Sequence, residues 1–191
     1  NFRALFWDCG VNVVAVEYRG FGLSEGTPNE RELRSDALEV FDWLRSQNDV
    51  LDVERLVLLG RSIGGAVALS VCEHRQHQIA ALVLENTFTS VGELVDVLMP
   101  HLRYFKFLLT NPWENVRVAP LLRELPCLFI MSGKDELIPP SMMPKLRDVY
   151  GGPKEWTVFP AAQHMNAHTF PGYNRQMKAF IEKNKKEKNK K

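Results

Sequence analysis

Residues 60–65 of this 191-residue chain read Gly-Arg-Ser-Ile-Gly-Gly, and they contain the residue best suited to covalent catalysis, Ser62. They match G-x-S-x-G, a pattern that places a nucleophilic serine on a sharp turn between a strand and a helix. Gly60 and Gly64 leave room for the turn, and Gly65 lets the helix approach the sheet. We expect the backbone N–H of Ile63, at the helix N-terminus, to stabilise an oxyanion.

A serine hydroxyl is a weak nucleophile, so Ser62 needs a general base and an acidic residue that orients the base. In hydrolases with this turn the residues follow the order serine, acid, histidine. Asp135 comes soon after the apolar run 127–132 and is the predicted acid, with its neighbour Glu136 as the alternative. The loop that follows a strand is where this carboxylate has to lie.

The predicted base is His164, which follows the apolar run 155–159 by five residues. His168 lies four residues further on and is the alternative. His164 is nearer to the end of the run, and therefore nearer to the sheet edge where the serine turn is expected. The sequence thus predicts a triad of Ser62, Asp135 and His164, which implies neither a metal ion nor a cofactor.

The segments around these residues alternate between strand and helix patterns. Short apolar runs rich in β-branched residues are typical of strands buried in a parallel sheet, and this order predicts an α/β fold. The first helix is expected to open with a capping box at 27–30 and Pro28 at its first helical position. Strands are expected at 11–18, 55–60, 79–85, 127–132 and 155–159, and helices around 33–44, 63–75, 139–150 and 172–183.

The stretch 88–124 interrupts this alternation, because it is long, apolar and aromatic and is broken by three prolines. It predicts a short helical insertion between two strands. We expect this insertion to cover the site as a lid that accepts an acyl chain, since each buried CH₂ is worth about 0.8 kcal/mol. The alternative is that its side chains only pack on the sheet.

Composition limits the function further. With 24 basic and 23 acidic residues the net charge is +1, so no overall field favours nucleic acid as a partner. Residues 182–191 include six lysines and two glutamates, which predicts a disordered tail or, alternatively, contact with anionic lipid. The three cysteines lack metal-ligand spacing and are expected to be buried free thiols. No apolar run approaches the roughly 20 residues that span a bilayer.

Several motifs in sequence order resemble one family. They are Glu-Tyr-Arg-Gly-Phe-Gly at 17–22 with Ser-Glu-Gly at 24–26, the serine turn at 60–66, Glu-Asn-Thr-Phe at 85–88 and Gly-Lys-Asp-Glu-Leu-Ile-Pro-Pro at 133–140. Over about residues 11–182 the chain resembles the α/β-hydrolases of the serine hydrolase superfamily. Within them it is similar to the branch of α/β-hydrolase domain-containing protein 13 and its fungal bud-emergence relatives.

The resemblance implies an α/β-hydrolase domain at 1–181 that lacks its first strands, with a mostly parallel sheet and helices on both faces. It implies Ser62 as nucleophile, Asp135 as acid and His164 as base. The implied reaction is hydrolysis of carboxylic esters or thioesters, with small molecules or lipidated proteins as acyl substrates. Related members remove long acyl chains from protein cysteines. The alternatives are a serine peptidase or amidase of the same superfamily, or a truncated form that acts only by binding.

In this family a His-Gly-Asn type loop supplies the second oxyanion donor, and the present chain begins after the expected position of that loop. Losing one such donor typically costs about 2.7–4 kcal/mol of transition-state stabilisation, so we expect the chain alone to be nearly inactive. Losing the first strands exposes a sheet edge and removes core partners, so we also expect the chain alone to be poorly stable. The nearest members are membrane proteins with an N-terminal signal anchor. Membrane association is therefore expected through an anchor upstream of Asn1 and through the lysine-rich tail.

Overall fold

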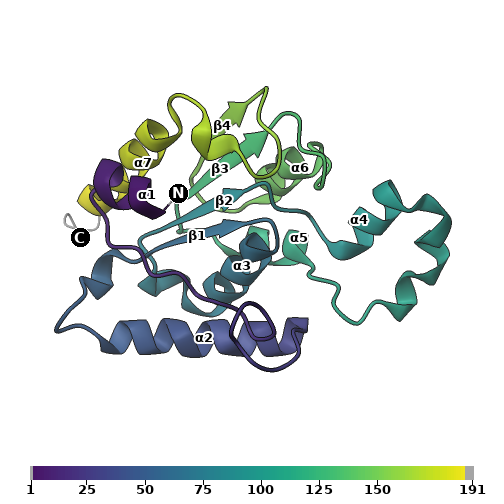
Figure 1. The fold of residues 1–191 in the computed structure, drawn as a ribbon, viewed down its shortest axis with the longest axis horizontal. Coiled ribbons are helices and arrows are strands. Elements are labelled where there is room, and N and C mark those ends of the chain that lie inside the picture. The colour runs from purple at the N-terminus through teal and green to yellow at the C-terminus, as the bar shows by residue number, and fades with distance from the viewer. Residues whose placement is uncertain (1, 188–191) are drawn as a thin grey trace.

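A computed structural model describes residues 2–187 of the chain (Figure 1). Four parallel strands form one sheet, and their spatial order is their order in the sequence. The strands are β1 (Val57–Arg61), β2 (Ala81–Glu85), β3 (Cys127–Ser132) and β4 (Lys154–Phe159). The prediction of an α/β fold with a parallel sheet is confirmed, and each of these strands lies within two residues of its predicted bounds.

Helices cover both faces of the sheet because the central strands are apolar on both sides. On β2, Leu82 and Leu84 face a core built with α2, α3 and α6, whereas Val83 faces a second core built with α1 and α7 (Figure 1). The α-helices are α1 (Phe2–Cys9), α2 (Glu30–Ser46), α3 (Ile63–Arg75), α4 (Val91–Leu98), α5 (Asn115–Val118), α6 (Met142–Val149) and α7 (Tyr173–Glu187). The 3₁₀ helices are η1 (Val53–Arg55), η2 (Gln76–Gln78), η3 (Pro100–Leu108), η4 (Ala119–Leu121) and η5 (Ala167–Thr169).

Helix α2 begins two residues later than the capping box predicted. Asn29 is the N-cap, and its side chain accepts a hydrogen bond of 3.0 Å from the Glu32 N–H. The predicted cap at Thr27 and the predicted helical position of Pro28 are therefore wrong. Asn is as good a cap as Thr, and here the first helical residue, Glu30, also accepts from the Trp113 N–H at 2.8 Å. This contact ties the helix start to the far end of the insertion.

The predicted strand at 11–18 is also wrong. Residues 11–18 form neither helix nor strand and pair with no strand of the described chain, and Val14 and Val16 are 52% and 45% exposed. A groove of about 530 Å³, lined largely by apolar side chains, lies between this segment and the outer edge of β1. A strand exists only with a hydrogen-bonded neighbour, so the apolar pattern of 11–18 is not enough to form one.

Helix α7 extends beyond the predicted end of the folded domain. Residues 182–187 continue this helix, so the prediction of a disordered tail from 182 is wrong for them; residues 188–191 lie outside the described part. Asn184 is 4% exposed and donates to the Phe180 carbonyl at 2.8 Å. Lys183 pairs with Glu155 of β4 at 2.9 Å. The lysine-rich composition suggested disorder, but the apolar face of the helix packs on the sheet.

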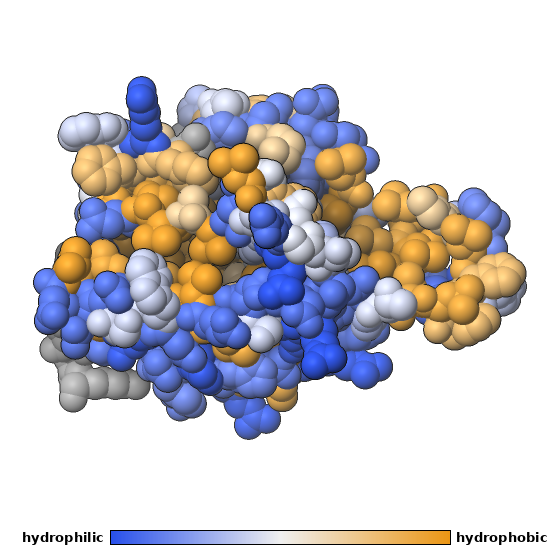
Figure 2. Space-filling model, turned by 60° about the horizontal axis from the view of Figure 1, so that its bottom comes forward, coloured by the Kyte–Doolittle hydropathy of each residue, from blue (hydrophilic) through white to orange (hydrophobic). Residues whose placement is uncertain are grey.

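Between β2 and β3 the chain forms a helical arm, which we define as residues 91–108. Helices α4 and η3 of the arm contact each other and contain no fully buried residue. Figure 1 shows the arm projecting beyond the carboxyl ends of the strands, and Figure 2 shows that apolar side chains dominate its surface. The base of the arm is anchored by Phe88 and Trp113, which are 3% and 5% exposed.

Candidate active site

Ser62 lies at the junction of β1 and α3, in a backbone conformation that serines rarely adopt. Its φ of 56° and ψ of −124° lie outside the regions that most L-residues occupy. The flanking glycines make this turn sterically possible. A Cβ on Gly60 would lie 2.3 Å from the Gly64 carbonyl oxygen, and a Cβ on Gly65 would lie 2.6 Å from the Cβ of Thr87. Strain of this kind is typical of functional turns.

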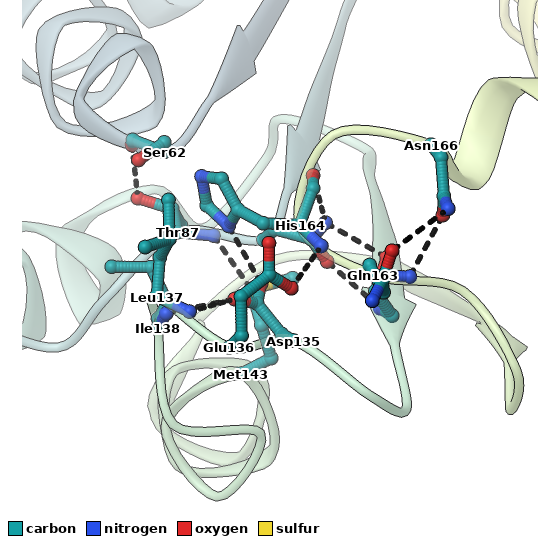
Figure 3. Close-up of polar contacts among 12 residues, drawn as sticks. Ser62, Thr87, Asp135, Glu136, Leu137, Ile138, Met143, Gln163, His164 and Asn166 are labelled. Carbon is teal, nitrogen blue, oxygen red and sulfur yellow. Dashed lines mark hydrogen bonds and ion pairs between the residues drawn. The ribbon is translucent and has the colours of Figure 1, made fainter.

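Hydrogen bonds from the end of β2 hold the strained turn in place. The Thr87 hydroxyl donates to the Ser62 carbonyl at 2.8 Å (Figure 3). The Ser62 N–H donates to the Glu85 carbonyl at 2.9 Å. Both main-chain polar groups of Ser62 are thereby fixed. The Ser62 side chain makes no capping bond to α3 and is free for another role. Ile63 is the first residue of this 13-residue helix, where an N–H group and the helix dipole favour negative charge.

Asp135 and His164 form a buried pair on the neighbouring loops. The Asp135 Oδ2 and the His164 Nδ1 lie 2.8 Å apart, and each side chain is 3% exposed. The other Asp135 oxygen, Oδ1, accepts from the N–H groups of Leu137 and Ile138 at 2.9 and 2.8 Å. The carboxylate is thus held by the start of its own loop and has one oxygen aimed at the imidazole. This geometry fixes the imidazole ring and favours its Nδ1–H tautomer.

The imidazole of His164 lies between Asp135 and Ser62 in Figure 3, with its second nitrogen on the Ser62 side. Within residues 2–187 no direct hydrogen bond joins Ser62 and His164. In sites without substrate such bonds are often long and tighten only in the reacting complex. The structure therefore brings the three predicted residues together at the carboxyl edge of the sheet, in the order nucleophile, base and acid.

The alternative residues occupy other positions. Within the described residues Glu136 makes no hydrogen bond to the imidazole; its Oε2 accepts from the His164 backbone N–H at 3.1 Å. This hydrogen bond is the main reason why the pKa of Glu136 lies below its ordinary value. His168 lies in η5, and its Nδ1 is buried without a hydrogen-bond partner in the described part of the chain. Neither residue forms an acid–base pair with the groups around Ser62.

Two further polar residues near the site were not singled out as site residues by sequence reasoning. Glu85 is 2% exposed, accepts from the Tyr173 hydroxyl at 2.7 Å, and burial raises its pKa above the ordinary value. Asn86 is 1% exposed and has a φ of 47°. The available signal was a run of three polar residues, Glu85-Asn86-Thr87, that begins with the last residue of an otherwise apolar strand.

The site contains no cluster suited to a metal ion. Among residues 2–187, no three His, Cys, Asp or Glu side chains are placed to hold one. The cysteines Cys9, Cys72 and Cys127 are free and buried, as predicted, and burial raises the pKa of each thiol. Thiols of this kind are poor nucleophiles and poor ligands.

Comparison with known sequences places most of the chain in one group. The sequence model of the serine aminopeptidase S33 family matches residues 2–124. The α/β-hydrolase domain-containing protein WAV2 of Arabidopsis thaliana is 33% identical over 94% of this chain and 63% of its own length. Protein bem46 of Schizosaccharomyces pombe is 31% identical over 95% of this chain and 61% of its own length.

The name of a third relative describes it as a membrane protein. The uncharacterized membrane protein YNL320W of Saccharomyces cerevisiae is 34% identical over 86% of this chain and 58% of its own length. The chain thus spans less than two thirds of the length of each of these relatives. Within residues 2–187, no helix is both long and apolar enough to cross a membrane.

Solved structures show the same fold at low identity. The meta-cleavage product hydrolase of Pseudomonas fluorescens IP01 has a TM-score of 0.69 and 15% identity, and the match covers 96% of this chain and 85% of that protein. The acetyl xylan esterase of Paenibacillus sp. R4 has a TM-score of 0.66 and 18% identity, and the match covers 80% and 52%. At these identities the likeness concerns the fold alone.

Proposed function

Since this chain belongs to the serine aminopeptidase S33 family of α/β-hydrolases, we propose that it hydrolyses carboxylic esters or thioesters with Ser62 as nucleophile, His164 as base and Asp135 as acid. The resemblance to α/β-hydrolases of the bud-emergence branch is confirmed by the matches to WAV2 and bem46. Membership of this family supports hydrolase chemistry in general. The triad and the choice of substrate are our proposal.

The proposed reaction is acyl transfer in two steps. The His164 Nε2 takes the proton from the Ser62 hydroxyl as its oxygen attacks the substrate carbonyl, and Asp135 stabilises the charged imidazole. The Ile63 N–H donates to the tetrahedral oxyanion at the N-terminus of α3. The intermediate collapses to an ester on Ser62, and His164 gives its proton to the leaving alcohol or thiol. Water, activated by the same imidazole, then hydrolyses this ester and frees Ser62.

The observation that carries this proposal is the buried Asp135–His164 pair opposite a strained serine. A hydrogen-bonded His–Asp pair by itself is compatible with a purely structural role. The φ of 56° at Ser62 is different, because it lies in a region that serines rarely adopt and strain of this kind is typical of functional turns. Its main chain is fixed on both sides while its hydroxyl makes no capping bond, which is the arrangement a nucleophile needs.

An acyl substrate is favoured by the apolar surface of the arm, which stands beside the carboxyl edge of the sheet. Apolar side chains there remain accessible: Tyr104, Phe105 and Phe107 are 71%, 56% and 79% exposed. A long acyl chain, such as that of a lipidated protein or a lipid ester, would bury such side chains. We therefore propose that the arm contacts the acyl group, so that the substrate is a long-chain ester or thioester.

The family name raises peptidase activity as the competing function, and the charges of the insertion weigh against it. An aminopeptidase site needs free carboxylates for the substrate α-amine. The insertion's candidates are all paired: Glu93 with Lys145 at 3.3 Å, Asp96 with Lys106 at 2.7 Å, and Glu114 with Arg117 at 3.4 Å. Paired carboxylates bind an added ammonium group weakly, because a cation already neutralises each of them.

We propose further that a longer form of the protein completes the site and associates with membranes. The relatives are longer than this chain, and the groove along β1 leaves one edge of the sheet without a partner in the described residues. A second oxyanion donor from upstream would raise the rate by roughly 10²–10³. Membrane association is supported by the name of the yeast relative, an uncharacterized membrane protein, and by the apolar arm.

Labelling with a fluorophosphonate probe, which reacts with activated serines, tests the proposal. The variants are the 191-residue chain, a form extended upstream, and Ser62→Ala in both. We expect labelling that depends on Ser62 and is much stronger in the extended form. No labelling of a folded extended form would overturn the proposal and favour a protein that acts only by binding.

A further inference from the structure

Asn86 is fully engaged by side-chain hydrogen bonds at the centre of the site. It follows β2 directly, is 1% exposed and has a φ of 47°, a left-handed conformation that Asn tolerates better than most residues. Its Nδ2 donates to the Ser132 hydroxyl and to the His164 backbone carbonyl, both at 2.9 Å. Its Oδ1 accepts from the Ser132 N–H at 2.8 Å. Both amide protons and the amide oxygen are therefore satisfied.

The bond to His164 reaches across 78 residues of sequence and connects two loops that no ladder hydrogen bond joins. On either side of Asn86, Glu85 and Thr87 fix the main chain of Ser62 through its N–H and its carbonyl. Glu85 and Thr87 thus hold the proposed nucleophile, Ser62. Asn86, which lies between them in the sequence, holds the proposed base, His164. The separation between Ser62 and His164 is set through this segment.

We propose that Asn86 is a positioning residue for the base: its amide fixes the main chain of His164 so that the imidazole faces Ser62. The proposal rests on the proposed function, because it assigns His164 the role of base. Within residues 2–187, the Asn86 side chain makes no hydrogen bond to the imidazole or to the nucleophile's hydroxyl. Its effect is on geometry, and a misplacement of about 1 Å at a reacting group can reduce a rate by about 10²-fold.

The three hydrogen bonds of the side chain explain why position 86 requires asparagine. Aspartate keeps the oxygen that accepts from Ser132 but presents a second oxygen, without a proton, to the His164 carbonyl. Two acceptors at 2.9 Å repel each other, so the loop of His164 must move. Leucine has similar bulk but leaves the His164 carbonyl and the Ser132 N–H buried without partners. Glycine accepts the positive φ but supplies no side chain.

The backbone N–H of His164 is held less firmly than its backbone carbonyl. Its N–H donates to Glu136 at 3.1 Å, but Glu136 is exposed, so water can replace the carboxylate. Water has no comparable access to the buried contact between Asn86 and the His164 carbonyl. We therefore expect Asn86 to dominate the placement of His164 and Glu136 to contribute little.

The test compares Asn86→Asp with Ser132→Ala in the upstream-extended form. Ser132→Ala removes one partner of the same amide but keeps the bond to His164, so it controls for lost stability. We expect Asn86→Asp to lower kcat on an ester substrate by about 10–10²-fold with KM nearly unchanged, because substrate contacts are intact. Ser132→Ala should keep a kcat close to that of the wild-type protein. Unfolding curves confirm that each variant is folded under the assay conditions.

A second readout does not depend on turnover. The proton shared by the His164 Nδ1 and Asp135 is observable by NMR at low field, and we expect Asn86→Asp to shift or broaden this signal and Ser132→Ala to preserve it. If Asn86→Asp does not fold, Asn86→Gly takes its place, since glycine accommodates the φ of 47° without added charge.

The outcomes separate the two proposals. A folded Asn86→Asp or Asn86→Gly protein with the kcat and the low-field signal of Ser132→Ala overturns the positioning role. If the wild-type protein and Ser62→Ala hydrolyse the ester equally, the proposed function fails, and the role of Asn86 for a base fails with it. A lost signal together with intact, Ser62-dependent turnover also overturns the inference, because the placement of His164 would then not limit the rate.

Discussion

A methyl group added at Gly65 tests how tightly the serine turn is built. In Gly65→Ala the new Cβ would lie 2.6 Å from both the Cβ and the Oγ1 of Thr87 and 3.1 Å from its Cγ2. Unstrained carbon atoms sit about 3.5–4.0 Å apart, so about 1 Å of movement is needed. Thr87 cannot give way by rotating its side chain, because the clash involves its Cβ. The residue is completely buried, and its hydroxyl is bonded to Ser62.

Two effects of opposite sign determine how far Gly65→Ala changes the free energy of unfolding. Overpacking of a close-packed site typically costs about 1–3 kcal/mol. Alanine in place of glycine in the first turn of α3 returns up to about 1 kcal/mol through helix propensity. We therefore expect a net loss of about 1–2 kcal/mol in the free energy of unfolding. We also expect probe labelling of Ser62 to slow by about 10²-fold, because the displaced group is the one that holds the nucleophile.

The assay is urea unfolding together with the labelling rate, in a double-mutant cycle with Thr87→Gly. That substitution removes all three clashing atoms, so Gly65→Ala should cost almost no stability in its background. Gly92→Ala in α4 is the matched control, since its new Cβ would meet nothing closer than 3.7 Å and should be neutral or slightly stabilising. Equal costs of Gly65→Ala in both backgrounds would refute the assigned clash.

Three further predictions follow from the site and its surroundings. Asp135→Asn should lower kcat by about 10⁴-fold, because the amide favours the wrong imidazole tautomer; Glu136→Gln, which can still accept from the His164 N–H, should keep most activity, and equal losses would contradict the assignment. Because burial raises the pKa of Glu85, the folded state binds this proton more tightly than the unfolded chain, and stability falls as the pH rises above about 4.5. Glu85→Gln should therefore gain stability over the wild-type protein in urea unfolding at pH 8 but not at pH 4.5, and a gain independent of pH would argue against this reasoning. Phe107→Ser on the arm should raise KM for long-chain but not for short-chain esters, and an equal change for both would remove the arm from the acyl site.

The wrong and incomplete predictions share a cause. In each case the structure of the segment depends on contacts with distant parts of the chain. Residues 11–18 have the composition of a strand, but a strand also needs a neighbour to pair with, and the described residues provide none there. Residues 182–187 have the composition of a tail, but α7 buries its apolar face on the sheet and carries the helix through them. Local composition contains no information about either contact.

The sequence by itself determined the serine turn, the alternation of strands and helices and the loops that carry the acid and the base. These features are local, because the G-x-S-x-G spacing and the apolar runs act within a few residues. The tertiary structure decided that Asp135 rather than Glu136 reaches the imidazole, and that Asn86 holds the main chain of His164. Those contacts join residues 28 to 78 positions apart, and packing in three dimensions alone decides which side chains meet.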